Sequence, residues 1–157
     1  MKEAYIYDGI RTPFGRYGGC LSSIRPDNMM AKVIKDLMER NKFDPNDVED
    51  VIVGCATQAG EDGRNIARFA GLMSGIPVKA GGITVNRLCG SGMASILDAA
   101  RCIRCNEGEL FVAGGVESMS RAPLVISKAS SAFGRDVQMF DTTLGMRFPN
   151  SNYVDNF

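Results

Sequence analysis

Residues 85–95 read VNRLCGSGMAS, a stretch in which a cysteine separates a short apolar run from a helical pattern. The apolar run that ends at Val85 predicts a short strand. The apolar residues that follow Gly92 recur at helical spacing and predict a helix that ends near Gly108. Cys89 therefore lies at a turn between a strand and a helix, and the three residues after it have small side chains.

The same alternation of strands and helices extends over residues 1–117. Apolar runs predict the strands, and apolar residues at i, i+3, i+4 and i+7 predict amphipathic helices. Strands that alternate with helices favour an α/β layered fold with a mainly parallel sheet and right-handed crossovers. Asp27 is the expected N-cap of the first helix. The predicted strands are 4–10, 51–55, 83–85 and 110–116, and the predicted helices lie within 26–41, 65–74 and 92–108.

Residues 118–157 have a different character. They are rich in Ser, Gly, Asn and isolated aromatic residues, and no clear periodicity predicts a helix or strand there. About forty irregular residues are too many for an ordinary connection in a compact domain. This segment is either a functional excursion or the start of a unit that is not finished.

The composition argues against several classes of binding partner and cellular location. Eighteen basic residues balance eighteen acidic ones, so neither nucleic acid nor an anionic membrane surface is expected as a partner. No apolar run approaches the roughly 18 residues that span a bilayer, and the first residues lack the pattern of a signal peptide. Five cysteines, an odd number, favour reduced thiols in the cytoplasm.

The position of Cys89 suits a nucleophile. Backbone N–H groups at the start of a helix are unsatisfied donors, and their positive potential favours a thiolate. The same donors can stabilise the oxyanion that forms when a substrate carbonyl is attacked. Gly90 and Gly92 let a ligand approach the backbone closely. The alternative is a buried structural cysteine at a glycine-rich turn, because free cysteine is commonly buried. The residues alone leave both interpretations open.

Two blocks of sequence carry a resemblance to a known family. VNRLCGSGMAS, together with LFVAGGVESMSRAP at 110–123, resembles the amino-terminal half of the thiolase family. Three further segments agree with this resemblance, which covers nearly the whole chain to about residue 150. GEDGRNIAR and DTTLGMRF look more like the 3-oxoadipyl-CoA branch than the acetoacetyl-CoA branch. The three segments are YIYDGIRTPFGRYGG, GCATQAGEDGRNIARFAGL and DTTLGMRF.

The resemblance implies a layered fold and its division. The complete enzymes have an αβαβα architecture, of which this chain would be the amino-terminal half. Residues 1–117 would form the α/β domain. Residues 118–157 would begin the loop domain, here incomplete, which covers coenzyme A and contributes to dimer and tetramer contacts. A cytoplasmic homo-oligomer that takes part in the degradation of fatty acids or aromatic compounds is therefore expected.

The resemblance also implies a chemistry. Thiolases are acyltransferases that cleave a 3-oxoacyl-CoA with free coenzyme A, or run the reverse Claisen condensation. Cys89 would take the acyl group as a thioester, and its backbone N–H would form part of an oxyanion hole. Coenzyme A would be a substrate, with no covalently bound cofactor and no metal. The residues expected to shape the turn are Asn86, Gly90, Ser91 and Gly92.

In one respect the sequence departs from the family. Thiolases place a histidine base, a water-positioning asparagine and a second cysteine in their carboxyl-terminal half, and this sequence contains no histidine. We therefore expect a truncated half that is inactive alone. Two alternatives stay open: a related ketoacyl-synthase-like condensing enzyme, which the ESMSRAP block argues against, and a non-catalytic assembly module. Such a module would bind a partner chain through its unfinished sheet or dimer face.

The remaining cysteines and an acidic loop are expected to have structural roles. Cys102 and Cys105 form a C-x-x-C spacing, but no second pair and no histidine complete a zinc site, so core or surface thiols are expected. Cys20 and Cys55 are expected to be packing residues. Residues 61–64 (EDGR) are expected to form a solvated loop with a helix cap, or to lie near a subunit interface as the resemblance implies.

Overall fold

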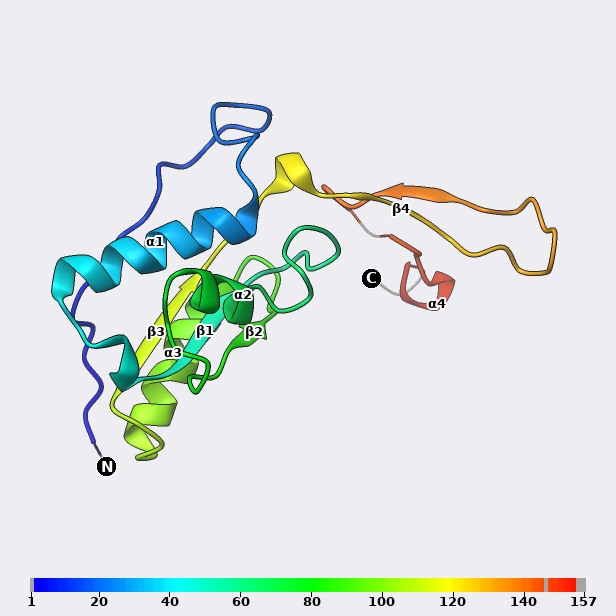
Figure 1. Ribbon diagram of the computed structural model, residues 1–157. Coiled ribbons are helices and arrows are strands. Elements are labelled where there is room, and N and C mark those ends of the chain that lie inside the picture. Colours follow the sequence, from blue (N-terminus) through cyan, green and yellow to red (C-terminus); the bar gives the residue numbers. More distant parts are fainter. Residues whose placement is uncertain (1, 146, 155–157) are drawn as a thin grey trace.

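The computed structural model describes residues 2–145 and 147–154, and it contains a parallel sheet with the strand order β2-β1-β3 (Figure 1). The alternation predicted from the sequence is confirmed, since helices connect all three strands. A separate two-stranded antiparallel sheet pairs β4 with β5. The helices are α1 (Pro26–Asn41), α2 (Ile66–Met73), α3 (Ser91–Arg104) and α4 (Ser151–Val154), with 3-10 turns at Pro45–Asp47 and Met119–Arg121. The strands are β1 (Val48–Gly54), β2 (Ile83–Val85), β3 (Leu110–Gly115), β4 (Leu124–Ile126) and β5 (Met139–Asp141).

The core lies between the sheet and the helices α1 and α2. Val51 and Val53 of the central strand are fully buried there, together with Ile34 of α1 and Ile66 of α2. Helix α3 contributes nothing to this cluster and packs against β1 and β3 from the other face of the sheet (Figure 1). Three layers therefore hold the strand ends in fixed register.

The start of α1 differs from the prediction. Arg25 is the N-cap residue and makes no capping hydrogen bond with its side chain, while Pro26 occupies the first turn. Proline suits this position because its missing N–H would be unpaired there in any case. Asp27 is therefore not the N-cap, and its carboxylate accepts bonds from the Arg25 guanidinium instead.

The strand predicted at residues 4–10 does not form. This N-terminal segment runs beside α1 without pairing to a strand (Figure 1). Side chains hold it in place. Arg40 Nη2 lies 2.6 Å from Asp8 Oδ2, and the ring centroids of Tyr7 and Phe43 are 5.0 Å apart. A run of β-forming residues predicts a strand, but a strand also needs a neighbouring edge with which to exchange backbone hydrogen bonds.

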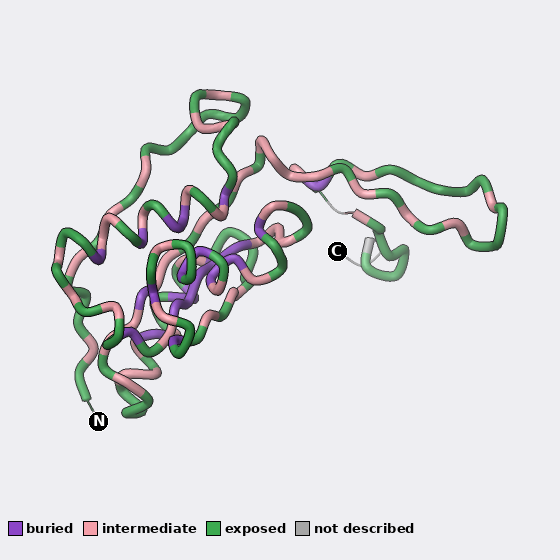
Figure 2. The backbone as a smooth tube through the Cα atoms, in the orientation of Figure 1, coloured by how far each residue is buried: buried purple, intermediate pink, exposed green. Residues whose placement is uncertain are grey.

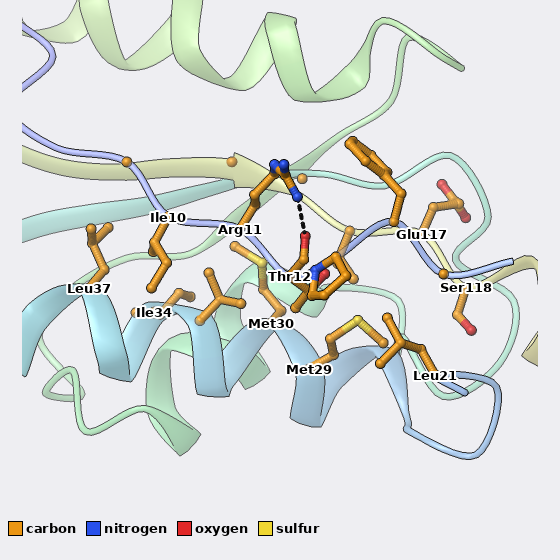
Figure 3. A pocket seen from close by; sticks show the side chains of 18 of the residues that line it. Ile10, Arg11, Thr12, Leu21, Met29, Met30, Ile34, Leu37, Glu117 and Ser118 are labelled. Atoms are coloured by element: carbon orange, nitrogen blue, oxygen red, sulfur yellow. Dashed lines mark hydrogen bonds between the residues drawn. The ribbon is translucent and has the colours of Figure 1, made fainter. Parts of the chain in front are cut away.

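A cleft separates this segment from β3. Its volume is about 520 Å³, and it is lined by residues 8–17, by α1 and by residues 112–120 (Figure 3). Ile10, Met30 and Ile34 contribute much of its apolar wall. Cys89 is not among the lining residues, so the cleft is separate from the predicted nucleophile.

The segment after β3 forms an extended arm. Strands β4 and β5 pair in antiparallel register and project away from the layered domain (Figure 1). Most residues of the arm are exposed (Figure 2). These two short strands could not be predicted from the sequence, because the composition of the segment is irregular. Of the predicted 118–157 segment, residues 146 and 155–157 lie outside the described residues.

None of the helices in the described ranges is long and apolar enough to cross a bilayer.

Candidate active site

The three parallel strands end side by side, and the turns that follow them form one site. Gly54 at the end of β1 is in register with Val85 of β2 and Gly115 of β3. The segments 55–57 and 86–90 are therefore brought together with the residues that follow β3. The carboxyl edge of a parallel sheet is where α/β proteins commonly place their ligand sites.

The turn before Cys89 is built around a left-handed residue. Leu88 has a φ of 51°, a conformation that costs a leucine roughly 1–2 kcal/mol. The Ser91 hydroxyl accepts the Arg87 N–H at 2.8 Å and donates to the Leu88 carbonyl at 2.6 Å. The amide of Gly90 donates to the Arg87 carbonyl at 3.0 Å. Local hydrogen bonds thus hold a sharp turn, which the sequence analysis predicted without identifying Leu88.

Cys89 emerges from this turn with its thiol exposed. The alternative of a buried structural cysteine is therefore wrong. Helix α3 begins at Ser91, with Gly90 as its N-cap residue. Among the described residues, the amides of Cys89, Gly92 and Met93 have no hydrogen-bond acceptor. The exposed Cys89 therefore directly precedes the N-cap of a 14-residue helix, and three backbone amides within residues 89–93 are available as donors.

Close packing fixes the start of α3 against the sheet. A Cβ atom added to Gly54 would lie 2.3 Å from the backbone carbon of Ser91, so only glycine fits there. One turn along the helix, the buried Ser95 hydroxyl lies 2.7 Å from the carbonyl oxygens of Gly92 and Gly114. The role of Gly54 could not be predicted from the sequence, because a glycine at a strand end gives no sign of the element that crosses it.

Two polar side chains connect the three turns. Asn86 donates from Nδ2 to the Ala56 carbonyl at 2.9 Å and accepts the Leu88 N–H at 2.8 Å. Glu117 accepts the N–H groups of Ala56 and Thr57 at 2.7 and 3.2 Å. The sequence pointed to Asn86 through its motif, but Glu117 lies 28 residues beyond Cys89 in the sequence and carried no local signal.

The other four cysteines lie in different environments. Cys55 is buried, and burial, followed by the charges of Glu117 and Asp62, raises the pKa of its thiol to about 12. Burial also raises the pKa of the half-buried Cys102 thiol. Cys105 is exposed, and so is Cys20, which is not the packing residue that was expected. The described residues contain no cluster of side chains that could hold a metal ion.

The acidic loop at 61–64 is not simply solvated. Glu61 forms a bidentate ion pair with Arg121, in which Nη2 lies 2.6 Å from Oε1, and it also contacts Arg25 at 3.3 Å. Asp62 is buried, accepts the Gly60 N–H at 3.0 Å, and has a pKa raised by this burial. These contacts tie the loop to the base of the arm.

Comparisons with known proteins agree along nearly the whole chain. The family model described as thiolase, N-terminal domain, matches residues 4–151. The 3-oxoadipyl-CoA/3-oxo-5,6-dehydrosuberyl-CoA thiolase of Escherichia coli K12 is 55% identical over 158 residues, which cover 100% of this chain and 39% of that protein. A β-ketoadipyl-CoA thiolase of Pseudomonas aeruginosa is 54% identical over 150 residues, covering 95% of this chain and 37% of that protein.

A solved structure matches as well. The Acat5 thiolase from Ascaris suum, in complex with coenzyme A, superposes with a TM-score of 0.83 and 33% sequence identity. The match covers 91% of this chain and 37% of that one. The chain thus spans about two-fifths of the length of the curated relatives that it matches.

Proposed function

The chain belongs to the thiolase family, and we propose that it carries the acyl-accepting cysteine of an enzyme that cleaves 3-oxoacyl-CoA. Its α/β fold is that of the family's N-terminal part. The observation that carries the proposal is the exposed Cys89 thiol beside three backbone amides that have no acceptor in the described residues. Run in reverse, the same site would perform a Claisen condensation.

Covalent catalysis at Cys89 divides the cleavage into two acyl transfers. First, the sulfur bonds to the 3-oxo carbonyl carbon, the C2–C3 bond breaks, and C2 keeps the electron pair and takes up a proton to give acetyl-CoA. Then the thiolate of free coenzyme A attacks the Cys89 thioester, and Cys89 leaves as a thiolate. The amides of Cys89, Gly92 and Met93 are available for the oxyanion, and each such donor is typically worth about 2.7–4 kcal/mol.

The turn residues support the nucleophile in this proposal. Asn86 and Ser91 hold the backbone of Leu88 from both sides. Gly90 and Gly92 leave space at the backbone, since a Cβ atom added to either would meet no atom closer than 3.4 Å. We assign proton transfer to residues outside this chain, because the chain contains no histidine. No metal and no covalently bound cofactor enters the scheme.

We assign the substrate to the class of 3-oxoacyl-CoA thioesters and favour 3-oxoadipyl-CoA, the intermediate type expected in the degradation of aromatic compounds. Support comes from the E. coli and P. aeruginosa relatives, whose names specify this acyl group. Free coenzyme A is then the second substrate, and coenzyme A is also part of the products. The solved relative in complex with coenzyme A supports that assignment.

A chimera tests the function directly. The chain replaces the matching 158 residues of the E. coli relative, and thiolysis of 3-oxoadipyl-CoA is followed by the loss of substrate absorbance. We expect turnover that Cys89→Ala abolishes, while Cys105→Ala, at another exposed cysteine, leaves it unchanged. A chimera that is folded by circular dichroism but inactive would contradict the proposal. Turnover that persists in Cys89→Ala would do so equally.

The arm and the assembly complete the proposal. We propose that residues 118–157 begin a loop domain that covers coenzyme A and contributes to a dimer or tetramer, with residues 1–117 as the α/β domain. The exposed apolar side chains of Leu124, Ile126 and Met139 on the arm support an interface role. We place the protein in the cytoplasm, since all five cysteines are free. Sedimentation of the chimera tests the assembly, and a monomer would contradict it.

A non-catalytic assembly module is the second candidate. The free edge of β3 beside the cleft favours it, because an unpaired edge can accept a strand from a partner. If the chain is such a module, Cys89→Ala should not change the complex that the chain forms with its partner. The thiolase family model argues against the ketoacyl-synthase alternative.

A further inference from the structure

We propose that Glu117 is a positioning residue for Cys89, a role that rests on the proposed function. Glu117 follows β3 by two residues. The Val116 N–H donates to the Gly54 carbonyl at 3.0 Å, which fixes the backbone before Glu117 beside the end of β1. The side chain therefore starts from a rigid point at the strand ends.

The first step runs from Glu117 to the turn after β1. Its Oε2 accepts the Ala56 N–H at 2.7 Å, and its Oε1 accepts the Thr57 N–H at 3.2 Å. Bonds to an ionised acceptor are roughly twice as strong as neutral ones. One carboxylate thus binds two successive amides and fixes the course of this turn.

The second step runs from that turn to the nucleophile. The Ala56 carbonyl accepts Asn86 Nδ2, and Asn86 Oδ1 accepts the Leu88 N–H. Leu88 occupies the left-handed region directly before Cys89. Because that conformation is unfavourable for leucine, it persists only where neighbouring groups hold it. Glu117 supports Asn86 through Ala56, and Asn86 supports the strained residue.

A positioning role and a simple charge effect have opposite consequences. If Glu117 positions the turn, its loss lets Leu88 relax and moves the sulfur away from the amides at the start of α3. Cys89 then reacts more slowly as a nucleophile. If Glu117 acts only as a negative charge, its loss favours the thiolate, and Cys89 reacts faster.

Alkylation of the 157-residue chain by limiting iodoacetamide at neutral pH distinguishes the two. Trypsin releases Cys89 in residues 88–101, separate from the other four cysteines, so mass spectrometry gives its rate alone. We expect Glu117→Ala to slow Cys89 by about threefold or more, as loss of a charge-assisted clamp implies. Glu117→Gln, which retains one acceptor oxygen, slows it less. The matched control is Glu109→Ala, since Glu109 is exposed and pairs with Lys2.

Further measurements separate positioning from a general loss of structure. Cys102 on α3 must keep its own rate in Glu117→Ala. In the double variant Glu117→Ala/Asn86→Ala, Cys89 must be alkylated no more slowly than in the slower single variant. Both substitutions break the same connection from Glu117 to Leu88. In the chimera, Glu117→Ala must lower kcat and leave KM unchanged.

The outcomes also separate this inference from the proposed function. If Cys89 of the unaltered chain reacts no faster than the exposed Cys20 and Cys105, the proposed function fails. If Cys89 is the fastest cysteine but Glu117→Ala leaves its rate equal or higher, only the positioning role is overturned. If Glu117→Ala changes the alkylation rate of Cys102 in parallel with that of Cys89, the positioning role is overturned as well.

Discussion

Two residues, Leu88 and Gly54, determine where the Cys89 sulfur lies. Leu88 turns the chain through a left-handed conformation, with its N–H bonded to Asn86 and its carbonyl bonded to Ser91. Gly54 lets α3 begin in direct contact with the end of β1. Cys89 is thereby exposed directly before the start of a helix. In the proposed function it accepts the acyl group there, and the first amides stabilise the oxyanion.

Gly54→Ala tests the close contact. The added methyl group would lie 2.3 Å from the Ser91 backbone, so the start of α3 must shift. We expect the free energy of unfolding to fall by about 1–3 kcal/mol, as is usual for overpacking. Alkylation of Cys89 should slow at the same time. Urea unfolding measures the first effect, and Gly9→Ala, where a Cβ atom meets nothing within 4 Å, is the control. Equal stability in both variants would contradict the packing account.

At this scale the sequence predicted the position of Cys89 but not the residues that hold the turn. Its place between a strand and a helix could be predicted because these elements are local in the sequence. Leu88 could not, since leucine rarely adopts positive φ and only the surrounding hydrogen bonds impose it. Glu117 was missed for another reason: its partners are backbone amides about 60 residues away, and backbone amides leave no trace in a sequence.

Among the elements, the N-terminal segment shows the limit of predicting strands from local composition. Its residues 4–10 are rich in β-forming residues, yet no backbone pairing forms, and side chains attach the segment to α1 instead. The helices were predicted more closely, because their hydrogen bonds are local. Helix α1 spans the predicted 26–41, and α3 ends at Arg104 rather than near Gly108. The arm could not be predicted, since its two short strands lie in a segment of irregular composition without clear periodicity.

Asp8 is the residue by which this attachment can be tested. Its hydrogen bonds with Arg40, then with Asn41 and the Gly9 amide, lower the pKa of its carboxyl to about 2. Because this folded-state pKa is below the ordinary value of 3.8, the attachment is fully present above pH 3.8 and is lost as the pH falls through about 2. An NMR titration should give a midpoint near the lower value. A midpoint near 3.8 would contradict the contact.

Asp8→Asn provides the same test at neutral pH. Loss of the charge weakens the contact with Arg40, so chymotrypsin should cleave after Tyr5 and Tyr7 severalfold faster. Asp36→Asn, which removes a surface pair with Lys32 on α1, is the matched control and should have no effect on these sites.

For the whole molecule, the proposed function gives this chain the nucleophile and leaves proton transfer to residues outside it. It spans 39% of its E. coli relative and contains no histidine. The cleft beside β3, the free edge of that strand and the exposed arm are surfaces that a larger assembly could cover. Position at the start of a helix can activate a thiol, but it cannot remove or deliver the proton at C2 of the substrate.

We therefore predict that the isolated 157-residue chain does not cleave acetoacetyl-CoA or 3-oxoadipyl-CoA above background. The loss of either substrate's absorbance measures this, with the chimera as the positive control. Turnover by the isolated chain that disappears in Cys89→Ala would contradict the prediction and would require a base among these residues.

The most direct test of the acyl-accepting role is to trap the intermediate. The chimera is mixed with 3-oxoadipyl-CoA without free coenzyme A, quenched in acid and digested with trypsin. We predict a succinyl group on residues 88–101, because cleavage between C2 and C3 leaves that acyl group on Cys89. Turnover by the chimera without an acyl group on this peptide, or with the group on another cysteine, would contradict the account.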